Sequence, residues 1–516
     1  MKIKYPIGIQ TFSEIITENY LYVDKTELIH TLVNESKYVF LSRPRRFGKS
    51  LLVSTLEAYF SGKSDLFHGL QIYTMETDWL EYPVFRLDLS GENFNAPNRL
   101  IEHIEWYLER IENRYGLRSE GSISLRFKQL IHKAFEKFGR RVVILIDEYD
   151  KPMLDCLDSA GLHEEIKTEL RGFYSSIKAC DEYIRFVLLT GVTKFGKVSI
   201  FSGLNNLKDI SLLSRYNAIC GISESEFHRD FKHSVLNFAN ANEISTDNVW
   251  ERFKAMYDGY HFASKGEDIY NPFSVLNAFQ ENDLKSYWYA TGSSSYLINL
   301  IKRHTYLLDR LDGERRSEDE LGNITDIDTD FVPLLYQSGY LTIKGYDPEQ
   351  REYTLAFPNF EVKEAFWKSL MKHFFREPGG GNPFDLKKFV SDLINGNPQE
   401  FMTRLQSMFA DIDSQPERNK EIHFQNMMAI TAKMLGFIVR TEVHSSAGRC
   451  DMQILTPNYI YIFEFKINGS CKEAIDQIYK KGYHLPFSAD TRSKFLIGAN
   501  FSTDTRTLTQ WIIEHI

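Results

Sequence analysis

The chain has 516 residues, of which 43% are hydrophobic and 25% charged, and its formal net charge is −9. This balance is typical of folded globular proteins and excludes intrinsic disorder, and the length suggests about three domains. No stretch reaches the roughly 18 apolar residues of a membrane-spanning helix, and the first residues lack a signal-peptide pattern. The five cysteines stand singly, which argues against a disulfide framework or a zinc ribbon. We therefore expect a cytoplasmic protein without a membrane partner.

Residues 1–220 alternate short apolar runs with segments of helical period. The runs 38–41, 84–87, 142–146 and 186–189 have the length and composition of buried strands. Between them, apolar residues recur at helical spacing before Gly116 and before Gly139. Strands that alternate with helices predict a mainly parallel sheet.

The first strand leads into a turn that is typical of a phosphate-binding loop. Residues 43–51 read Arg43-Pro-Arg45-Arg46-Phe47-Gly48-Lys49-Ser50-Leu51, and residues 51–60 have helical character. Backbone N–H groups at such a helix start bind phosphate, the lysine reaches the β- and γ-oxygens, and the serine hydroxyl binds Mg²⁺. Arg43 stands where the full pattern has glycine. With Arg45 and Arg46 it adds positive charge that suits phosphate oxygens.

A second motif supports nucleotide binding. The strand 142–146 ends at Asp147 and Glu148, as in a Walker B strand, where the aspartate supports Mg²⁺ and the glutamate polarises the attacking water. The next strand ends at Thr190, which would lie beside the γ-phosphate as a sensor or form a plain strand-end turn. Arg215 is a candidate arginine finger acting in cis or in trans, or a structural residue. Together the motifs predict ATP and Mg²⁺ as cofactors.

The rest of the chain divides into further segments. Residues 221–330 are mostly helical, and residues 331–377 read helix, strand, strand, helix, as in a winged-helix unit or another helix–hairpin packing. Three consecutive glycines between prolines indicate a linker at 378–383, before a last domain at 384–516. Residues 361–516 carry 19 Lys+Arg and 18 Asp+Glu, so charge does not exclude DNA from that part.

An acidic β-hairpin follows near the C-terminus, with strands at 451–455 and 459–466. If Leu455 pairs with Ile460, Asp451 lies opposite Glu464, and Lys466 shares the face of Glu464. Opposed carboxylates repel unless a cation lies between them, and Mg²⁺ suits oxygen ligands. The lysine would then stabilise charge on a water or a scissile phosphate. A solvated hairpin is the alternative, and a one-residue slip would move Asp451 to the other face.

Two helices flank this hairpin. The first begins at a capping box at Ser414 and carries Glu421, a candidate third metal-side acid. The second follows the hairpin and presents Gln477 and Lys480 to the site or to a phosphate backbone, unless they are plain surface residues.

With both constellations the chain resembles the bacterial AAA-ATPase-like family that carries a C-terminal domain of the PD-(D/E)XK nuclease superfamily. The resemblance rests on the segments 22–26, 43–50, 145–150, 190–195, 257–262, 270–274, 357–362, 448–451 and 463–466. It implies an α/β fold with a P-loop NTPase parallel sheet at 1–220, a helical and winged-helix middle at 221–377, and a restriction-endonuclease-like domain at 384–516. Arg43 is then a family feature.

The resemblance also implies site roles and a function. The superfamily pattern of a metal-binding Asp followed by Glu-x-Lys matches Asp451, Glu464 and Lys466, while Cys450 replaces the proline of the superfamily's name. The expected activity is ATP hydrolysis coupled to a Mg²⁺-dependent DNA nuclease. The alternative is a nucleotide-driven switch or scaffold whose C-terminal module binds nucleic acid or a partner without cutting. We expect DNA as a partner and no small-molecule substrate beyond the nucleotide, and a homo-oligomer is an open alternative.

Overall fold

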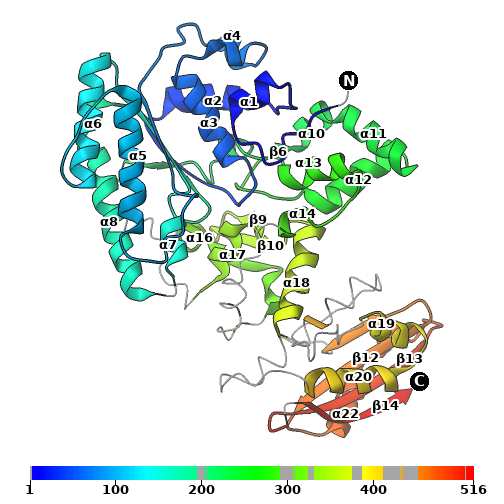
Figure 1. Ribbon diagram of the computed structural model, residues 1–516. Coiled ribbons are helices and arrows are strands. Elements are labelled where there is room, and N and C mark those ends of the chain that lie inside the picture. The colour runs from blue at the N-terminus through cyan, green and yellow to red at the C-terminus, as the bar shows by residue number, and fades with distance from the viewer. Residues whose placement is uncertain are drawn as a thin grey trace. The chain divides into compact units, whose positions relative to one another are not determined.

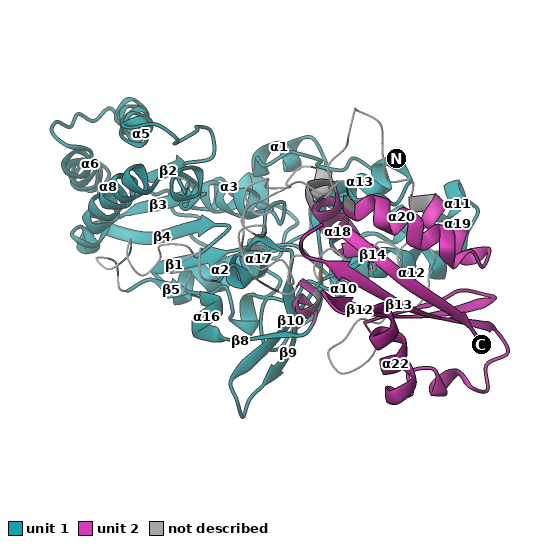
Figure 2. Ribbon diagram, turned by 90° about the horizontal axis from the view of Figure 1, so that it is seen from below, with its two compact units in different colours: residues 1–292, 313–362 teal, residues 293–312, 363–516 magenta. Residues whose placement is uncertain are grey.

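The computed structural model describes residues 3–157, 159–194, 206–290, 308–322, 330–374, 386–410, 451–505 and 507–516, with residues 201, 204, 301, 306, 430, 431 and 433. The chain divides into two compact units (Figures 1 and 2). The first comprises residues 1–292 and 313–362, and the second comprises residues 293–312 and 363–516. The expected ATPase domain and most of the expected helical and winged-helix segments fall in the first unit, whereas residues 293–312 and 363–377 fall in the second. The domain boundaries themselves stay predictions.

A five-stranded sheet with the order β2-β3-β4-β1-β5 lies at the centre of the first unit. Its strands are β1 (Tyr38–Ser42), β2 (Val84–Asp88), β3 (Val142–Asp147), β4 (Ile184–Gly191) and β5 (Lys208–Asp209). All neighbouring strands pair in parallel, which confirms the predicted sheet. Every residue of β1 and β3 is buried. The carboxyl ends of β1 and β3 therefore flank the end of β4 at one edge.

Helices cover this sheet. α3 (Lys49–Phe60), α5 (Arg99–Tyr115) and α6 (Ile123–Phe138) pack on its strands, and α6 also packs on α8 (Ala160–Lys178) (Figure 1). α5 and α6 end at glycines in the left-handed conformation, as predicted for Gly116 and Gly139. Shorter helices precede and connect these: α1 (Phe12–Thr17), α2 (Thr26–Glu35), α4 (Ile72–Met75) and α7 (Lys151–Asp155).

A helical group follows, with an aromatic core that includes Phe227, Phe253 and Phe279. Its helices are α10 (Glu224–Asp230), α11 (Lys232–Asn242), α12 (Thr246–Tyr257), α13 (Pro272–Glu281) and α14 (Tyr287–Ala290), and β6 (Ile222–Ser223) pairs with β7 (Ile269–Tyr270). The aromatic rings fill a core that the short helices could not bury singly.

The predicted helix, strand, strand, helix order is present in α17 (Val332–Ser338), β9 (Thr342–Asp347), β10 (Glu352–Ala356) and α18 (Phe360–Phe374). β8 (Glu314–Ser317) directly precedes the short α16 (Glu318–Gly322) and adds a third antiparallel strand, in the order β8-β10-β9. The winged-helix assignment itself stays a prediction.

The second unit contains a four-stranded mixed sheet of order β11-β12-β13-β14. The strands are β11 (Met452–Leu455), β12 (Tyr459–Ile467), β13 (Ser493–Ser502) and β14 (Thr507–His515). The helix α22 (Cys471–Lys481) connects the parallel strands β12 and β13 and packs on both. α19 (Leu386–Ile394) and α20 (Pro398–Ala410) meet the alternate residues of β12, because the Tyr461 hydroxyl bonds to Leu393 and Phe463 packs on Phe401.

The linker at 378–383 and the helix with Glu421 lie outside the described residues. Among the residues that are described, no helix combines the length and the apolar composition needed to cross a membrane.

Candidate functional site

The predicted phosphate loop connects β1 to α3. Gly48 precedes α3 with φ of 93°, a left-handed conformation that glycine adopts without strain and that leaves the first N–H groups of the helix unobstructed. The Lys49 side chain is buried, and its ammonium donates to the carbonyl oxygens of Arg43 at 3.1 Å and Pro44 at 3.3 Å. Its nitrogen also lies 3.5 Å from Glu148 Oε1. The loop lysine therefore lies beside Glu148, the second acid of the predicted Walker B motif.

Asp147 ends β3 beside β4, the strand that carries the candidate sensor Thr190. The Thr190 hydroxyl donates to Asp147 Oδ1 at 2.5 Å, and the Ser50 side chain lies beside the same carboxylate. Burial raises the pKa of Asp147 above its usual value, and the side chains of Ser50 and Thr190 oppose this shift. Asp147 Oδ2 is buried and has no hydrogen-bond partner among the described residues. Three predicted nucleotide-site residues thus converge, with one carboxylate oxygen left over.

The turn after β3 is held under strain. Glu148 has φ of 54°, which is costly for a side chain other than glycine and is typical of functional sites. The next acid, Asp150, is fully buried and accepts from the backbone N–H groups of Val192 and Thr193 and from the Thr193 hydroxyl. These bonds fix the end of β4 against the turn and keep Glu148 beside Lys49.

The arginines of the loop differ in their placement. We expected Arg43 to face phosphate, but its buried guanidinium donates to the carbonyls of Ser211 at 2.8 Å and Tyr216 at 3.0 Å and lies 4.3 Å from the centroid of the Phe262 ring. A buried guanidinium needs such acceptors, because desolvation without them is costly. Arg43 therefore anchors the loop to the segment that contains Ser211 and Tyr216.

Arg45 and Arg46 line a cavity of about 490 Å³ together with Lys49, Ser50 and Glu148, which is a volume typical of ligand sites. The candidate finger Arg215 instead donates through Nη1 to both carboxylate oxygens of Glu35, at 2.6 and 2.7 Å. A finger role in cis or in trans stays a prediction beside a structural role.

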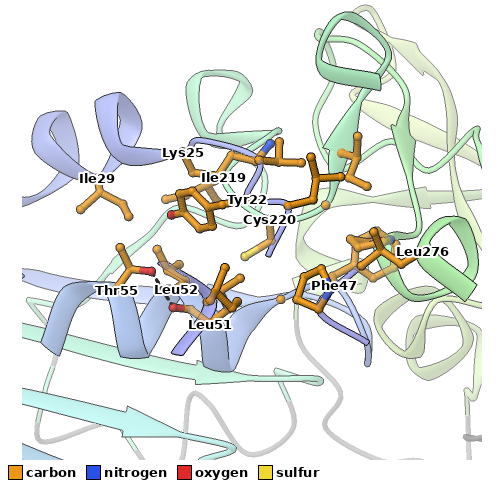
Figure 3. A pocket seen from close by; sticks show the side chains of 18 residues that line it. Tyr22, Lys25, Ile29, Phe47, Leu51, Leu52, Thr55, Ile219, Cys220 and Leu276 are labelled. Carbon is orange, nitrogen blue, oxygen red and sulfur yellow. Dashed lines mark hydrogen bonds between the residues drawn. The ribbon is translucent and has the colours of Figure 1, made fainter. Parts of the chain in front are cut away.

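An apolar pocket of about 100 Å³ adjoins this cavity, and both are lined by Gly48 and Leu51. Figure 3 shows Tyr22 facing the α3 residues Leu51 and Leu52 across the pocket, with Phe47 at one end. Aromatic and aliphatic walls of this kind suit the faces of a planar base.

The second candidate site lies on the sheet of the C-terminal unit. Leu455 pairs with Ile460 and Met452 with Phe463, which confirms the predicted register of the hairpin. The same register brings Asp451 opposite Glu464, and Asp451 Oδ2 accepts from the backbone N–H of Phe465 at 2.7 Å. A slip of one residue is thereby excluded.

Glu464 and Lys466 project towards α22, on the face where Ile460 and Ile462 pack against that helix. Gln477 of α22 joins them: its amide N–H donates to Glu464 Oε1, and its carbonyl accepts from the Lys466 ammonium at 2.6 Å. Lys466 Nζ lies 3.5 Å from Glu464 Oε1. The predicted contribution of Gln477 is thus present, whereas Lys480 is exposed and has no bond to these residues within the described part.

Glu464 is 3% exposed, and burial together with the charge of Asp451 raises its pKa to about 7. Glu464 Oε2 is buried without a hydrogen-bond partner among the described residues. The described chain holds no cluster of three or more metal-ligand side chains, and the predicted third acid, Glu421, lies outside it. Asp451 and Glu464 are therefore the two carboxylates that could hold a cation here.

Comparisons with known proteins give the families of the regions in which both candidate sites lie. A family model described as a predicted AAA-ATPase matches residues 6–201, and a model of the PD-(D/E)XK nuclease superfamily matches residues 419–511. A protein of Azotobacter chroococcum mcd 1, described as an uncharacterized protein in the vnfD 5′ region, is 35% identical over 532 residues that cover 99% of each chain. The chain belongs to this AAA-ATPase-like family with a C-terminal PD-(D/E)XK nuclease superfamily domain. The matched ranges contain the two sites described above.

Sequence reasoning missed two parts of this AAA-ATPase-like site. Residues 6–10 line the cavity beside the loop, although this segment lies about 40 positions before Lys49 in the chain. Phe273 lies under the Arg46 guanidinium at 4.8 Å and comes from the helical group. The segment 270–274 contributes to the family resemblance, but a single sequence does not show that this segment or residues 6–10 lie beside the loop.

Proposed function

We propose that this AAA-ATPase-like protein binds and hydrolyses ATP with Mg²⁺ and that its C-terminal unit is a Mg²⁺-dependent DNA nuclease. One observation carries both halves of the proposal. In each site a single carboxylate oxygen, Asp147 Oδ2 or Glu464 Oε2, is buried without a hydrogen-bond partner among the described residues. Such an oxygen is costly unless it meets a cation or a donor, and Mg²⁺ prefers oxygen ligands.

The two neighbouring cavities would bind different parts of ATP. The cavity with Arg45, Arg46 and Lys49 supplies cationic groups for the phosphates, and the apolar pocket behind Gly48 and Leu51 supplies a surface for the base. Phosphate draws the Lys49 ammonium away from neutral carbonyl oxygens, because charge-assisted hydrogen bonds are stronger. Arg43, held by backbone carbonyls, keeps the loop in shape.

In hydrolysis, bound Mg²⁺ would neutralise negative charge on the phosphates. Ser50 and Asp147 are the groups that would hold it, and Thr190 fixes the orientation of the aspartate through Oδ1. Glu148 lies at the loop with its carboxylate near Lys49, where it orients a water for attack on the γ-phosphate. Release of Lys49 to the phosphate frees that carboxylate for the water.

For DNA cleavage, Asp451 and Glu464 would hold Mg²⁺, which supplies an activated water and stabilises the departing charge. Lys466 lies beside Glu464 and is directed by the Gln477 carbonyl, so its ammonium is positioned for a scissile phosphate. The near-neutral charge of residues 361–516 favours contact through a few placed basic side chains over a broad basic surface.

The deciding measurement is cleavage of labelled DNA with Mg²⁺ or Mn²⁺, with and without ATP, by the wild type and by Lys49→Ala and Asp451→Ala. We expect Asp451→Ala to abolish cutting and keep ATP turnover, and Lys49→Ala to abolish ATP binding. Unchanged melting temperatures control for folding.

Intact DNA under every metal and nucleotide condition, with ATP turnover that still depends on Lys49, would refute the nuclease half. The C-terminal unit would then act as a binding module of a nucleotide-driven switch.

A further inference from the structure

Two chains of contacts link the phosphate loop to the buried carboxylate of Glu361. Trp288 of α14 is almost fully buried, and its indole Nε1–H donates to the backbone carbonyl of Arg45 at 3.1 Å. The backbone N–H of Trp288 donates to Glu361 Oε1 at 2.7 Å. One residue therefore bonds to the loop through its side chain and to Glu361 through its backbone.

The second connection runs through α13. The Arg46 guanidinium lies 4.8 Å from the centroid of the Phe273 ring. The next residue, Ser274, is fully buried, and its hydroxyl donates to Glu361 Oε2 at 2.7 Å. The two oxygens of Glu361 are thus bonded to two different segments, and each segment contacts a different residue of the loop.

Glu361 lies in the first turn of α18, and it is completely buried. Burial raises its pKa to about 7, so a carboxylate at this position is costly for the fold. An apolar residue would avoid the cost and would break both connections. α18 begins in the first compact unit and, from Lys363 on, belongs to the second. α18 is a continuous helix of 15 residues, about 22 Å long, so its first turn and the residues assigned to the second unit belong to one element.

We propose that Trp288, Ser274 and Glu361 couple nucleotide binding at the phosphate loop to the C-terminal nuclease unit by displacing the start of α18. The inference rests on the ATP binding proposed above and adds the residues through which the two sites communicate. These are positioning residues: Trp288 bonds to the loop backbone, Trp288 and Ser274 each bond to Glu361, and none of the three lines the nucleotide cavity.

Such coupling needs an element with two alternative positions, and Arg46 of the loop has them: over the Phe273 ring or at a phosphate oxygen. Arg46 lines the cavity and also lies over Phe273. A phosphate oxygen in the cavity competes for the same guanidinium, and a charge-assisted hydrogen bond is stronger than a cation–π contact at an exposed arginine. Phosphate therefore draws Arg46 off the Phe273 ring, and α13 with Ser274 is freed to shift against Glu361.

Two variants remove one connection each with little loss of packing. Trp288→Phe removes the indole donor to Arg45 and keeps the backbone bond to Glu361, and Ser274→Ala removes the hydroxyl. Trp250→Phe is the matched control, because Trp250 packs on Phe227 and His228 in the same unit, away from the loop. The measurements are ATP affinity, amide hydrogen exchange of residues 361–370 with and without MgATP, and the ratio of DNA cleavage rates with and without ATP.

In the wild type and Trp250→Phe, we expect MgATP to change both the exchange of α18 and the cleavage ratio by about fivefold or more. In Trp288→Phe and Ser274→Ala we expect both effects to fall below about twofold, with ATP affinity within about threefold of the wild type. Full effects in both variants, or a wild type that binds ATP without any response of α18, would overturn the coupling.

The same measurements keep the two proposals apart. A wild type without ATP binding refutes the proposed ATPase and the coupling with it. Loss of the α18 response in the two variants supports the coupling even if no DNA is cut, in which case only the nuclease proposal fails.

Discussion

The buried carboxylate of Glu361 gives the stability of this protein a pH dependence that one substitution should remove. The group is completely buried, its two hydrogen bonds come from the uncharged groups of Ser274 and Trp288, and burial raises its pKa from the usual 4.5 to about 7. Each pH unit between the two pKa values is worth about 1.4 kcal/mol, so the ionised carboxylate costs the fold about 3 kcal/mol.

The sign of this pH dependence follows from the protonation of Glu361 in the folded and the unfolded chain. Below pH 4.5 the group is protonated in the folded and the unfolded chain, and it contributes no pH dependence. Between pH 4.5 and about 7 the folded chain keeps the proton that the unfolded chain has lost, so stability falls as the pH rises. Above that range both forms are ionised, and the full cost applies.

Glu361→Gln removes this titration and keeps the geometry. The amide oxygen accepts from the Trp288 N–H, and the amide nitrogen donates to the Ser274 hydroxyl, which reverses its role. We expect the free energy of unfolding of the variant to exceed that of the wild type at pH 8 by about 3 kcal/mol more than it does at pH 4.5.

Urea unfolding of both proteins at intervals between pH 4.5 and 8, followed by circular dichroism, measures this difference. Asp258 and Glu464, whose pKa values burial also raises to about 7, are common to both proteins and cancel. Glu105→Gln removes the same charge at an exposed site, and we expect it to stay within about 0.5 kcal/mol of the wild type throughout. A difference between Glu361→Gln and the wild type that does not change with pH would refute the reasoning.

Three further predictions concern the sites and their support. Glu148→Gln should lower the kcat of ATP hydrolysis about 100-fold or more and leave the Kd for ATP within about threefold, as single-turnover and binding assays would show. Gln477→Ala should lower metal-dependent DNA cleavage about 10-fold, because it releases both Lys466 and Glu464, and an unchanged rate would contradict that role. Gly191→Ala should cost about 2–4 kcal/mol of stability in thermal unfolding, since its Cβ would lie 2.4 Å from Asp150 Oδ1 and 2.7 Å from the Tyr149 ring.

The parts of the fold that depend on local pattern were predictable from the sequence. The strand before Gly48, the strand that ends at Asp147 and the helices that end at Gly116 and Gly139 all carry local signals, and the structure confirms them. The hairpin register was left between two possibilities in the sequence, and the structure confirms the one that pairs Leu455 with Ile460.

Contacts between distant segments were not predictable in the same way. The guanidinium of Arg43 was expected at phosphate because its charge and its place in the loop are visible in the sequence. The carbonyls of Ser211 and Tyr216 that receive it are more than 160 residues away and leave no mark in the residue pattern. The roles of Trp288 and Glu361 were missed for the same reason. Glu361 lies in a segment that carries the family resemblance, but the sequence does not show that it is buried against Trp288 and Ser274.

The two candidate sites share an arrangement of lysine and glutamate. In each site, this arrangement makes the binding of phosphate and the binding of a divalent cation depend on each other. In each site a lysine ammonium lies 3.5 Å from a glutamate oxygen, Lys49 from Glu148 and Lys466 from Glu464, and neutral carbonyl oxygens hold it there. Under the proposed function, a phosphate that attracts the lysine leaves the acidic groups of the site without their positive neighbour. That loss makes divalent cation binding more favourable, and by linkage a bound cation makes phosphate binding more favourable. The same reasoning explains why each site leaves one buried carboxylate oxygen without a protein donor among the described residues: a donor placed there would compete with the cation on which substrate binding depends.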